Sequence, residues 1–135
     1  MKIIHKSAGV IIVDKKLLVG RSVGKTFFIA PGGKAEPGET DTEALIRELY
    51  EEYQIQVSES ELDDFGTWEA EAIGLEDTIV KMHVFIVKSW QGDLIPSAEV
   101  EEMRFITSVI PEDMELGSIF AHDVIPKLKS LDLID

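Results

Sequence analysis

The sequence contains no cysteine, and this absence removes several classes of chemistry. Disulfide bonds and a thiol nucleophile are excluded, and a reducing compartment is compatible with such a chain. No apolar run reaches the length of a membrane span. Residues 1–13 are interrupted by His5, Lys6 and Ser7 and lack a cleavage site, so we expect no signal peptide. A cytoplasmic protein is the default expectation.

Positive charge is scarce. Thirteen Lys and Arg stand against 26 Asp and Glu, which gives a net charge of −13. This balance argues against a nucleic acid or an anionic membrane as partner, because both attract basic surfaces. A phosphate-binding site would need bound metal ions to offset the charge. Hydrophobic residues make up 44% of the 135 residues, which predicts one folded domain rather than disorder.

One helix stands out in the middle of the chain. Thr40 is a good N-cap residue, and Glu43 three positions later completes a capping box. An apolar stripe follows at helical spacing, formed by Ala44, Leu45, Leu49 and Tyr53. These signals predict a helix over residues 41–53.

This helix carries three glutamates at i, i+3 and i+4, namely Glu48, Glu51 and Glu52. The spacing places them on one side of the helix, where like charges repel by a few tenths of a kcal/mol per pair. A hard cation would reverse the sign of that energy, and carboxylate oxygens suit magnesium or manganese. The alternative is an ordinary solvated face, which is what most acidic helices present.

The segment that precedes the helix also supports a metal site there. The segment Ala30-Pro31-Gly32-Gly33 ends a predicted strand in a loop with accessible backbone carbonyls. It is followed by Glu36-Pro37-Gly38-Glu39, with Pro and Gly at the central positions of a type II turn. A glycine-containing loop therefore leads directly into the acidic helix.

The segment from Gly33 to Ile55 resembles the signature of the Nudix (MutT-like) hydrolases. That signature is Gly, five residues, Glu, seven residues, and then Arg-Glu-apolar-x-Glu-Glu-x-Gly-apolar. The fixed positions here are Gly33, Glu39, Arg47, Glu48, Glu51 and Glu52, with apolar residues at Leu49 and Ile55. One position departs from the pattern, because Gln54 replaces the second glycine. That glycine normally ends the helix in a left-handed turn, which costs other residues about 1 kcal/mol.

The resemblance implies a role for each matching residue. Glu48, Glu51 and Glu52 correspond to the ligands of Mg²⁺ or Mn²⁺, and the Gly33 carbonyl corresponds to a frequent further ligand. Glu48 also matches the position often credited as the base that activates water. Arg47 and Glu39 match residues that orient the metal-binding carboxylates.

The remaining segments predict an α/β protein. Strands are expected over residues 3–13, 17–20, 27–30, 68–72, 79–88 and 103–107, a helical connection from Ile110, and a last helix over 118–131 that Pro126 interrupts. Its apolar stripe is Phe120, Val124, Leu128 and Leu131. The resemblance narrows the fold to a Nudix-type α/β/α sandwich with a central mixed β-sheet, as a single Nudix hydrolase domain over residues 1–135.

Residues 79–88 show the clearest strand alternation, with Val80, Met82, Val84 and Ile86 on one face and Lys81, His83, Phe85 and Val87 on the other. We expect His83 to be a hydrogen-bonded sheet residue, because no His or Cys cluster surrounds it. Glu69 and Glu71 are consistent either with a charged sheet edge or with a cleft wall.

Nudix enzymes often use one more carboxylate from a region downstream of the helix, as ligand or base. Glu102 is our candidate, with Glu99 next, and an ordinary acidic loop is the alternative. Arg21 and Lys25 could contact substrate phosphates or could simply be solvated. Trp68, Phe27, Phe28 and Trp90 could stack on a base but are more typical of a core.

The implied reaction is metal-dependent hydrolysis of a nucleoside diphosphate-linked small molecule. The ADP-ribose hydrolases usually carry a proline, and the diadenosine-polyphosphate hydrolases a tyrosine, downstream of the signature; neither marker is found here. The isomerase branch needs a cysteine, and decapping enzymes bind RNA. A nucleoside or deoxynucleoside triphosphate pyrophosphohydrolase remains. A nucleotide-sugar or other diphosphate-conjugate hydrolase and a non-catalytic nucleotide-binding module stay open, as does a homodimer.

Overall fold

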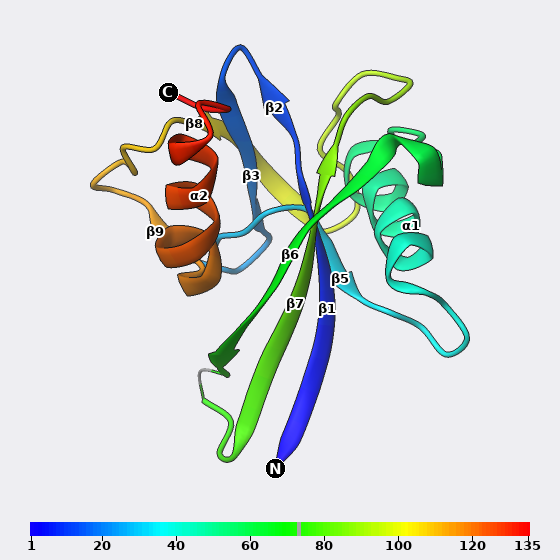
Figure 1. Cartoon of the computed structure of the whole chain (residues 1–135), viewed down its shortest axis with the longest axis vertical. Coiled ribbons are helices and arrows are strands. Elements are labelled where there is room, and N and C mark those ends of the chain that lie inside the picture. The colour runs from blue at the N-terminus through cyan, green and yellow to red at the C-terminus, as the bar shows by residue number, and fades with distance from the viewer. Residues whose placement is uncertain (73) are drawn as a thin grey trace.

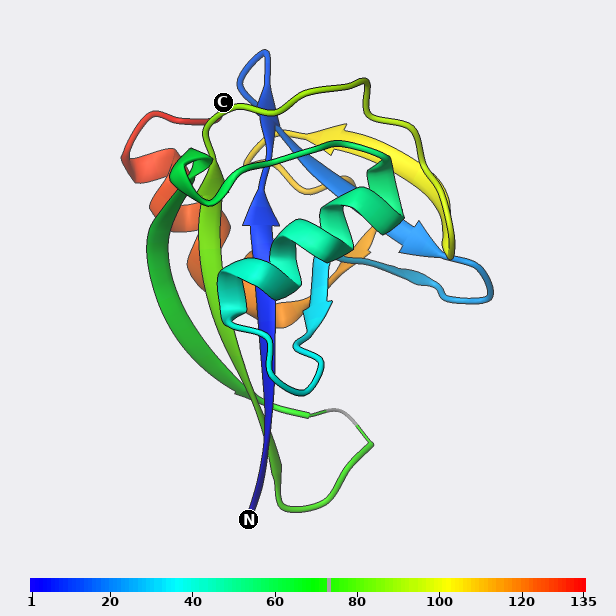
Figure 2. The same cartoon turned by 90° about the vertical axis from the view of Figure 1, so that its right-hand side faces the viewer.

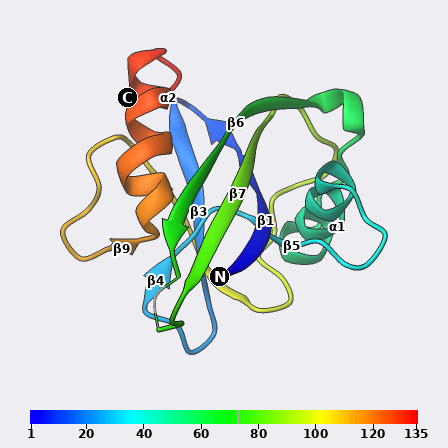
Figure 3. The same cartoon turned by 60° about the horizontal axis from the view of Figure 1, so that its bottom comes forward.

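Two helical segments flank a set of twisted strands. The computed structural model describes residues 1–72 and 74–135. Helix α1 (Asp41–Tyr53) lies on one side of the strands and α2 (Ile125–Ser130) on the other (Figure 1). A view from below shows the same arrangement, with β1, β7 and β6 running between the two helices (Figure 3). The expected α/β/α sandwich is confirmed.

The largest sheet is mixed and includes the strand with Gly33. Its strand order is β5-β1-β7-β6, with bounds Gly32–Lys34, Lys2–Val10, Thr78–Val87 and Leu62–Glu71. Strands β1 and β7 are parallel, whereas β5 and β6 pair antiparallel with their neighbours. Glu69 and Glu71 are both exposed on the edge strand β6, a position that is consistent with either interpretation. Helix α1 crosses in front of β1 in Figure 2.

Two smaller sheets complete the strand layer. Strands β2 (Ile12–Val13), β3 (Lys16–Ser22) and β8 (Val100–Ile106) form an antiparallel sheet, and β4 (Phe27–Phe28) pairs parallel with β9 (Glu115–Leu116). The expected helical connection from Ile110 is wrong. The Met114 N–H donates to the Pro111 carbonyl at 3.0 Å and closes a single turn, after which the chain pairs with β4.

The alternation along the central strands creates a core on each face. Ala8, Val10 and Val84 pack with the C-terminal helical segment, whereas Phe85 and Val87 pack with α1. Both faces of residues 79–88 therefore lie as predicted. Three residues of the predicted stripe pack in the core beside α1, namely Leu45, Leu49 and Tyr53. The fourth, Ala44, is also fully buried. Burying each such side chain contributes about 1.5–3 kcal/mol.

The C-terminal segment is continuous but irregular. A π-helix, η2 (Phe120–Val124), leads directly into α2, and the Ile125 N–H donates to the Phe120 carbonyl. Pro126 has no N–H to donate, so the expected interruption takes the form of a π-turn at the residues before it. The placement of Leu131 on the apolar stripe is wrong: it is 54% exposed, and Ile134 is fully buried instead.

A short 3₁₀-helix, η1 (Glu59–Glu61), precedes β6. In the part of the chain that the structure describes, none of the helices has both the length and the apolar character needed to span a membrane.

Candidate metal-binding and nucleotide site

Local sequence fixes where α1 begins and ends. The Thr40 N–H donates to Glu43 Oε1 at 2.9 Å, and the Glu43 N–H donates to Thr40 Oγ1 at 3.2 Å, which is the predicted capping box. At the other end Gln54 adopts the left-handed conformation, with φ 58° and ψ 25°. The helix therefore ends as the signature glycine would end it, although the residue is glutamine.

The two glycines before α1 pack closely against neighbouring elements, Gly32 against β1 and Gly33 against Glu48 of α1. Gly32 has φ +141°, and a Cβ there would lie 2.0 Å from the Ser7 carbonyl oxygen. A Cβ on Gly33 would lie 3.0 Å from the carboxyl carbon of Glu48. Because neither residue has a side chain, β5 can pack between β1 and the carboxylates of α1.

Arg47 ties the acidic residues to this loop. Its Nε donates to Glu39 Oε2 at 2.8 Å and its Nη2 to Glu39 Oε1 at 3.0 Å, a bidentate pair. Its Nη1 donates to Glu48 Oε1 at 2.8 Å and to Glu51 Oε2 at 3.3 Å, and its Nη2 also reaches the Lys34 carbonyl at 3.1 Å. The hydrogen bonds from Arg47 hold the pKa of Glu39 below its usual range.

Glu52 is a half-buried carboxylate of the cluster. Its Oε1 accepts a hydrogen bond from the Gly32 N–H at 3.1 Å. Burial raises the pKa of Glu52 to about 8; the Gly32 N–H works against this shift, and Glu48 and Glu51 add to it. Four glutamates and one arginine leave an excess of negative charge, so the donor set is suited to a hard cation.

The carboxylates would have to turn to bind such a cation. Within residues 1–72 and 74–135, no three His, Asp or Glu side chains converge closely enough to hold a metal ion as they stand. Glu48 and Glu51 instead each accept a hydrogen bond from Arg47 Nη1. The residues that could supply oxygens are those of the signature, Glu48, Glu51 and Glu52, with the Gly33 carbonyl next to them.

Glu102 is not part of this group of side chains on and beside α1. It is on β8 directly opposite Arg21 on β3, and Arg21 forms ion pairs with Glu102 at 3.4 Å and with Glu101 at 3.2 Å. Along β8, Glu102 alternates with Met103, which packs in the α1 core, so Glu102 lies on the opposite face of that sheet. Glu99 is exposed. The structure thus brings Glu39, Arg47, Glu48, Glu51 and Glu52 together, and it places Glu102 with Arg21.

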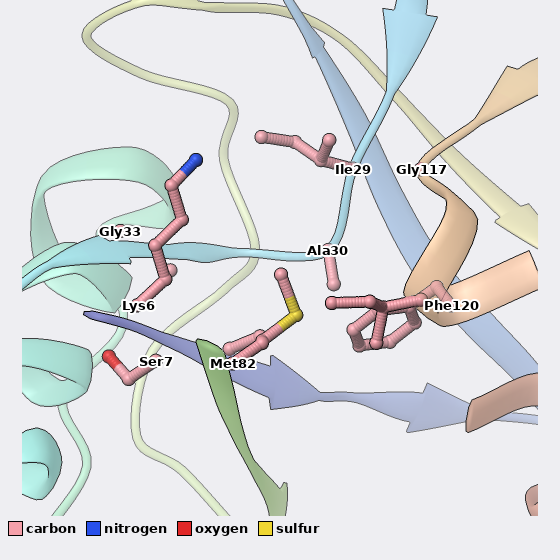
Figure 4. Close-up of a pocket in the computed structure, with 11 residues that line it drawn as sticks. Lys6, Ser7, Ile29, Ala30, Gly33, Met82, Gly117 and Phe120 are labelled. Carbon is pink, nitrogen blue, oxygen red and sulfur yellow. The ribbon is translucent and has the colours of Figure 1, made fainter. Parts of the chain in front are cut away.

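An apolar cavity of about 90 Å³ adjoins the loop (Figure 4). Met82, Ala30 and Phe120 point toward one another there, and Ile119 and Ile29 also line it. Gly33 and Lys6 lie at one end of the cavity, and Gly33 packs against Glu48. The Ala30–Gly33 segment was expected near the site, whereas sequence reasoning missed Met82, Ile119 and Phe120, because they come from segments far from it in the chain. The aromatic residues that we considered for base stacking lie outside the lining: Trp68, Phe27, Phe28 and Trp90.

His83 is a hydrogen-bonded sheet residue, as expected. Its Nδ1 lies 2.8 Å from Asp41 Oδ2 and its Nε2 lies 2.8 Å from Asp64 Oδ2. Desolvation of the ring acts to lower the pKa of His83, but the hydrogen bonds and charges of both aspartates together raise it above its usual value. The ring therefore links the first turn of α1 to β6.

Comparison with known proteins agrees with this geometry. The sequence profile of the NUDIX domain matches residues 3–126. A protein of Proteus vulgaris named 8-oxo-dGTP diphosphatase is 34% identical over 99 residues, which cover 69% of this chain and 83% of that protein.

Solved structures show the same fold. The solution structure of the E. coli ORF135 protein has a TM-score of 0.71 at 26% identity, over 97% of this chain and 89% of that one. The MutT NUDIX hydrolase of Burkholderia pseudomallei has a TM-score of 0.72 at 14% identity, over 98% and 97%, and supports the fold alone. Because the profile covers most of the chain, including the acidic helix and the glycine loop, this protein belongs to the Nudix family and is a Nudix hydrolase.

Proposed function

We propose that this Nudix hydrolase converts a nucleoside or deoxynucleoside triphosphate to the monophosphate and pyrophosphate. The observation that carries the proposal is the position of Glu48, Glu51 and Glu52 beside the Gly32–Gly33 loop, which leads into an apolar cavity. The cavity has room for part of a ring, and the carboxylates suit the cation that accompanies a polyphosphate. The name of the Proteus vulgaris relative, 8-oxo-dGTP diphosphatase, supports a nucleotide substrate.

In this proposal Glu48, Glu51, Glu52 and the Gly33 carbonyl hold Mg²⁺, or Mn²⁺ in its place. The bound metal would polarise phosphate oxygens and offset their charge. Arg47 and Glu39 keep the glutamates oriented, because they connect the loop to the helix through the bidentate pair. We propose residues 1–135 as one Nudix domain that acts in the cytoplasm on a small molecule and not on nucleic acid.

Glu48 is the base that we favour for the attacking water. It lies against Gly33, within the cluster, and Arg47 donates to it at 2.8 Å. Glu102 is the second candidate, and it would have to leave its ion pair with Arg21 to act on this side of the sheet. In either case the carboxylate would take the proton of the water as its oxygen bonds to phosphorus, and the bond to the leaving phosphate would break.

Product analysis tests the proposal. Purified protein with Mg²⁺ is incubated with common and oxidised nucleoside triphosphates, nucleotide sugars, ADP-ribose and dinucleoside polyphosphates. We expect monophosphate and pyrophosphate from at least one triphosphate, and loss of that activity on addition of EDTA. Glu52→Gln should lose most activity but fold normally, since the amide oxygen can still accept the Gly32 N–H. Glu112→Gln, at an exposed position, is the matched control.

The other outcomes are informative. Cleavage of only a diphosphate conjugate would keep the mechanism and replace the proposed substrate. Nucleotide binding without turnover of any compound would contradict the proposed reaction and favour a binding module. Undiminished turnover by Glu52→Gln would contradict the assignment of the metal site.

A further inference from the structure

One buried hydroxyl in the central sheet has no hydrogen-bond partner. Ser7 on β1 is 3% exposed, and its Oγ is the only buried side-chain nitrogen or oxygen of the described residues that forms no hydrogen bond. A hydroxyl that is removed from water without a new partner lowers the stability of the fold. Thr78, which is also buried, donates to the Glu76 carbonyl at 2.9 Å. Ser7 therefore departs from the rule that buried polar side chains are satisfied.

The strand register fixes the face from which Ser7 projects. Ser7 pairs with Gly33 on β5 and with His83 on β7. Directly paired residues project from the same face of a sheet. The ring of His83 contacts the first turn of α1, and a Cβ on Gly33 would meet the carboxylate of Glu48 on the same helix. Ser7 therefore projects toward α1, and its hydroxyl points away from Met82 and the apolar cavity (Figure 4).

The carboxylate of Glu48 is the nearby acceptor. Its carboxyl carbon would lie 3.0 Å, and its Oε2 3.2 Å, from a Cβ on Gly33. Cβ atoms of directly opposite residues are about 4.5–5.5 Å apart, so only the empty side-chain position of Gly33 separates Ser7 from this carboxylate. The Glu48 side chain is 18% exposed, and its Oε1 accepts from Arg47 Nη1 at 2.8 Å. Rotation of the Glu48 side chain away from Arg47 would bring the carboxylate and the Ser7 hydroxyl together.

We propose that Ser7 is a positioning residue, whose hydroxyl donates a hydrogen bond to the Glu48 carboxylate when Glu48 turns from Arg47 toward a divalent cation. This inference rests on the metal site of the proposed function and is independent of the choice of nucleotide. A carboxylate that ligates a cation keeps lone pairs for a hydrogen-bond donor, and such donors orient metal ligands. The Ser7 hydroxyl gives up no other hydrogen bond when it forms this one.

The test measures Mn²⁺ binding to the nucleotide-free protein by electron paramagnetic resonance. We expect Ser7→Ala to raise the Kd for Mn²⁺ about 10- to 100-fold, and Ser7→Thr, which keeps a hydroxyl, to remain close to wild type. The Tm of metal-free Ser7→Ala should rise by a few degrees, because alanine removes a buried polar group that has no partner.

Thr78→Val is the matched control, because it removes a buried hydroxyl that does have a partner. Its Tm should fall, and its Kd for Mn²⁺ should equal that of wild type. The two variants are therefore expected to change stability in opposite directions, and only Ser7→Ala should change the affinity for the metal ion.

Three results for Ser7→Ala would overturn the positioning role. These are an unchanged Kd for Mn²⁺, a loss of affinity that Thr78→Val equals, and a loss of affinity accompanied by a lower Tm of the metal-free protein. Failure of wild type to bind Mn²⁺ would overturn it together with the proposed metal site.

Product formation is measured separately, so that the two proposals can fail independently. Weaker Mn²⁺ binding by Ser7→Ala, in a protein whose wild type cleaves no triphosphate, would support the positioning role while the proposed reaction failed. Cleavage of a triphosphate by wild type, with the same Mn²⁺ affinity in Ser7→Ala, would support the reaction and contradict the role of Ser7.

Discussion

Arg47 donates a hydrogen bond to each carboxylate oxygen of Glu39, from Nε to Oε2 at 2.8 Å and from Nη2 to Oε1 at 3.0 Å. The two residues are eight positions apart and belong to different elements, the turn before α1 and the helix itself. The same guanidinium donates to Glu48 and Glu51. One planar group thus sets the distance between the glycine loop and the acidic helix face.

Replacement of Arg47 by lysine should disrupt the site more than the fold. Lysine keeps the charge but cannot make the planar, two-point contact with Glu39. We expect kcat/KM to fall about 10- to 100-fold, the range typical of residues that orient metal ligands, with a much smaller change in Tm. Arg104→Lys is the control, because Arg104 forms no bidentate pair: its Nη1 lies 3.6 Å from Asp113 Oδ2 and its guanidinium lies over the Phe28 ring. Activity equal to that of wild type would contradict the positioning role.

His83 should make stability depend on pH. A protonated imidazole can donate to Asp41 and Asp64 at once, whereas a neutral ring has one donor only. The folded-state pKa is raised, so this stabilisation is complete below the unfolded pKa of about 6.5 and is lost as pH rises through the folded value. The effect should be less than about 1 kcal/mol, because Asp64 is largely exposed.

Urea unfolding of wild type and His83→Gln from pH 5.5 to 8.5 measures this dependence. We expect the stability difference between the two proteins to be largest at low pH and to shrink as pH rises. His122→Gln is the control for a histidine in another part of the chain. A difference that grew with pH would show that His83 is neutral in its bridge.

Gly32 should tolerate no side chain. A Cβ would lie 2.0 Å from the Ser7 carbonyl oxygen, and the φ of +141° is itself unfavourable for alanine. We expect Gly32→Ala to lower the free energy of unfolding by at least about 3 kcal/mol or to prevent folding, since backbone atoms of β1 cannot move aside. The measurement is thermal or urea unfolding followed by circular dichroism.

Gly24→Ala separates the cost of a positive φ from the cost of the close approach to Ser7. Gly24 also has a positive φ, +78°, but a Cβ there would meet no atom within 4 Å. This variant should lose only about 1 kcal/mol, the ordinary cost of the left-handed conformation. Equal losses in Gly24→Ala and Gly32→Ala would indicate that the close approach to Ser7 is not what requires glycine.

Gln54→Gly should stabilise the protein slightly. The left-handed φ of 58° at Gln54 lowers the stability of the fold, whereas the hydrogen bond from Gln54 Nε2 to Ser97 Oγ at 2.7 Å partly offsets this loss. We expect a net gain of about 0.5 kcal/mol, and a gain nearer 1 kcal/mol when the same change is made in Ser97→Ala, where that hydrogen bond is already absent. A double-mutant cycle by urea unfolding measures both. A loss of stability in both backgrounds would contradict this explanation.

Much of the site's framework could be predicted from the sequence, because it depends on local interactions. The capping box of Thr40 and Glu43, the bounds of α1 and its buried stripe each follow from residues within one or two helical turns of one another. The same holds for the alternation along residues 79–88, which the two cores confirm. The metal and catalytic roles of Gly33, Glu39, Arg47, Glu48, Glu51, Glu52 and Glu102 stay predictions.

Only the tertiary structure decided which distant segments meet. Strand register placed Lys6 beside Lys34 and Glu102 beside Arg21, and a one-residue shift would have turned each pair to another face. Packing placed His83 between two aspartates and buried Ile134 where Leu131 was expected. These contacts depend on pairing between residues far apart in the chain, and no local propensity encodes that pairing.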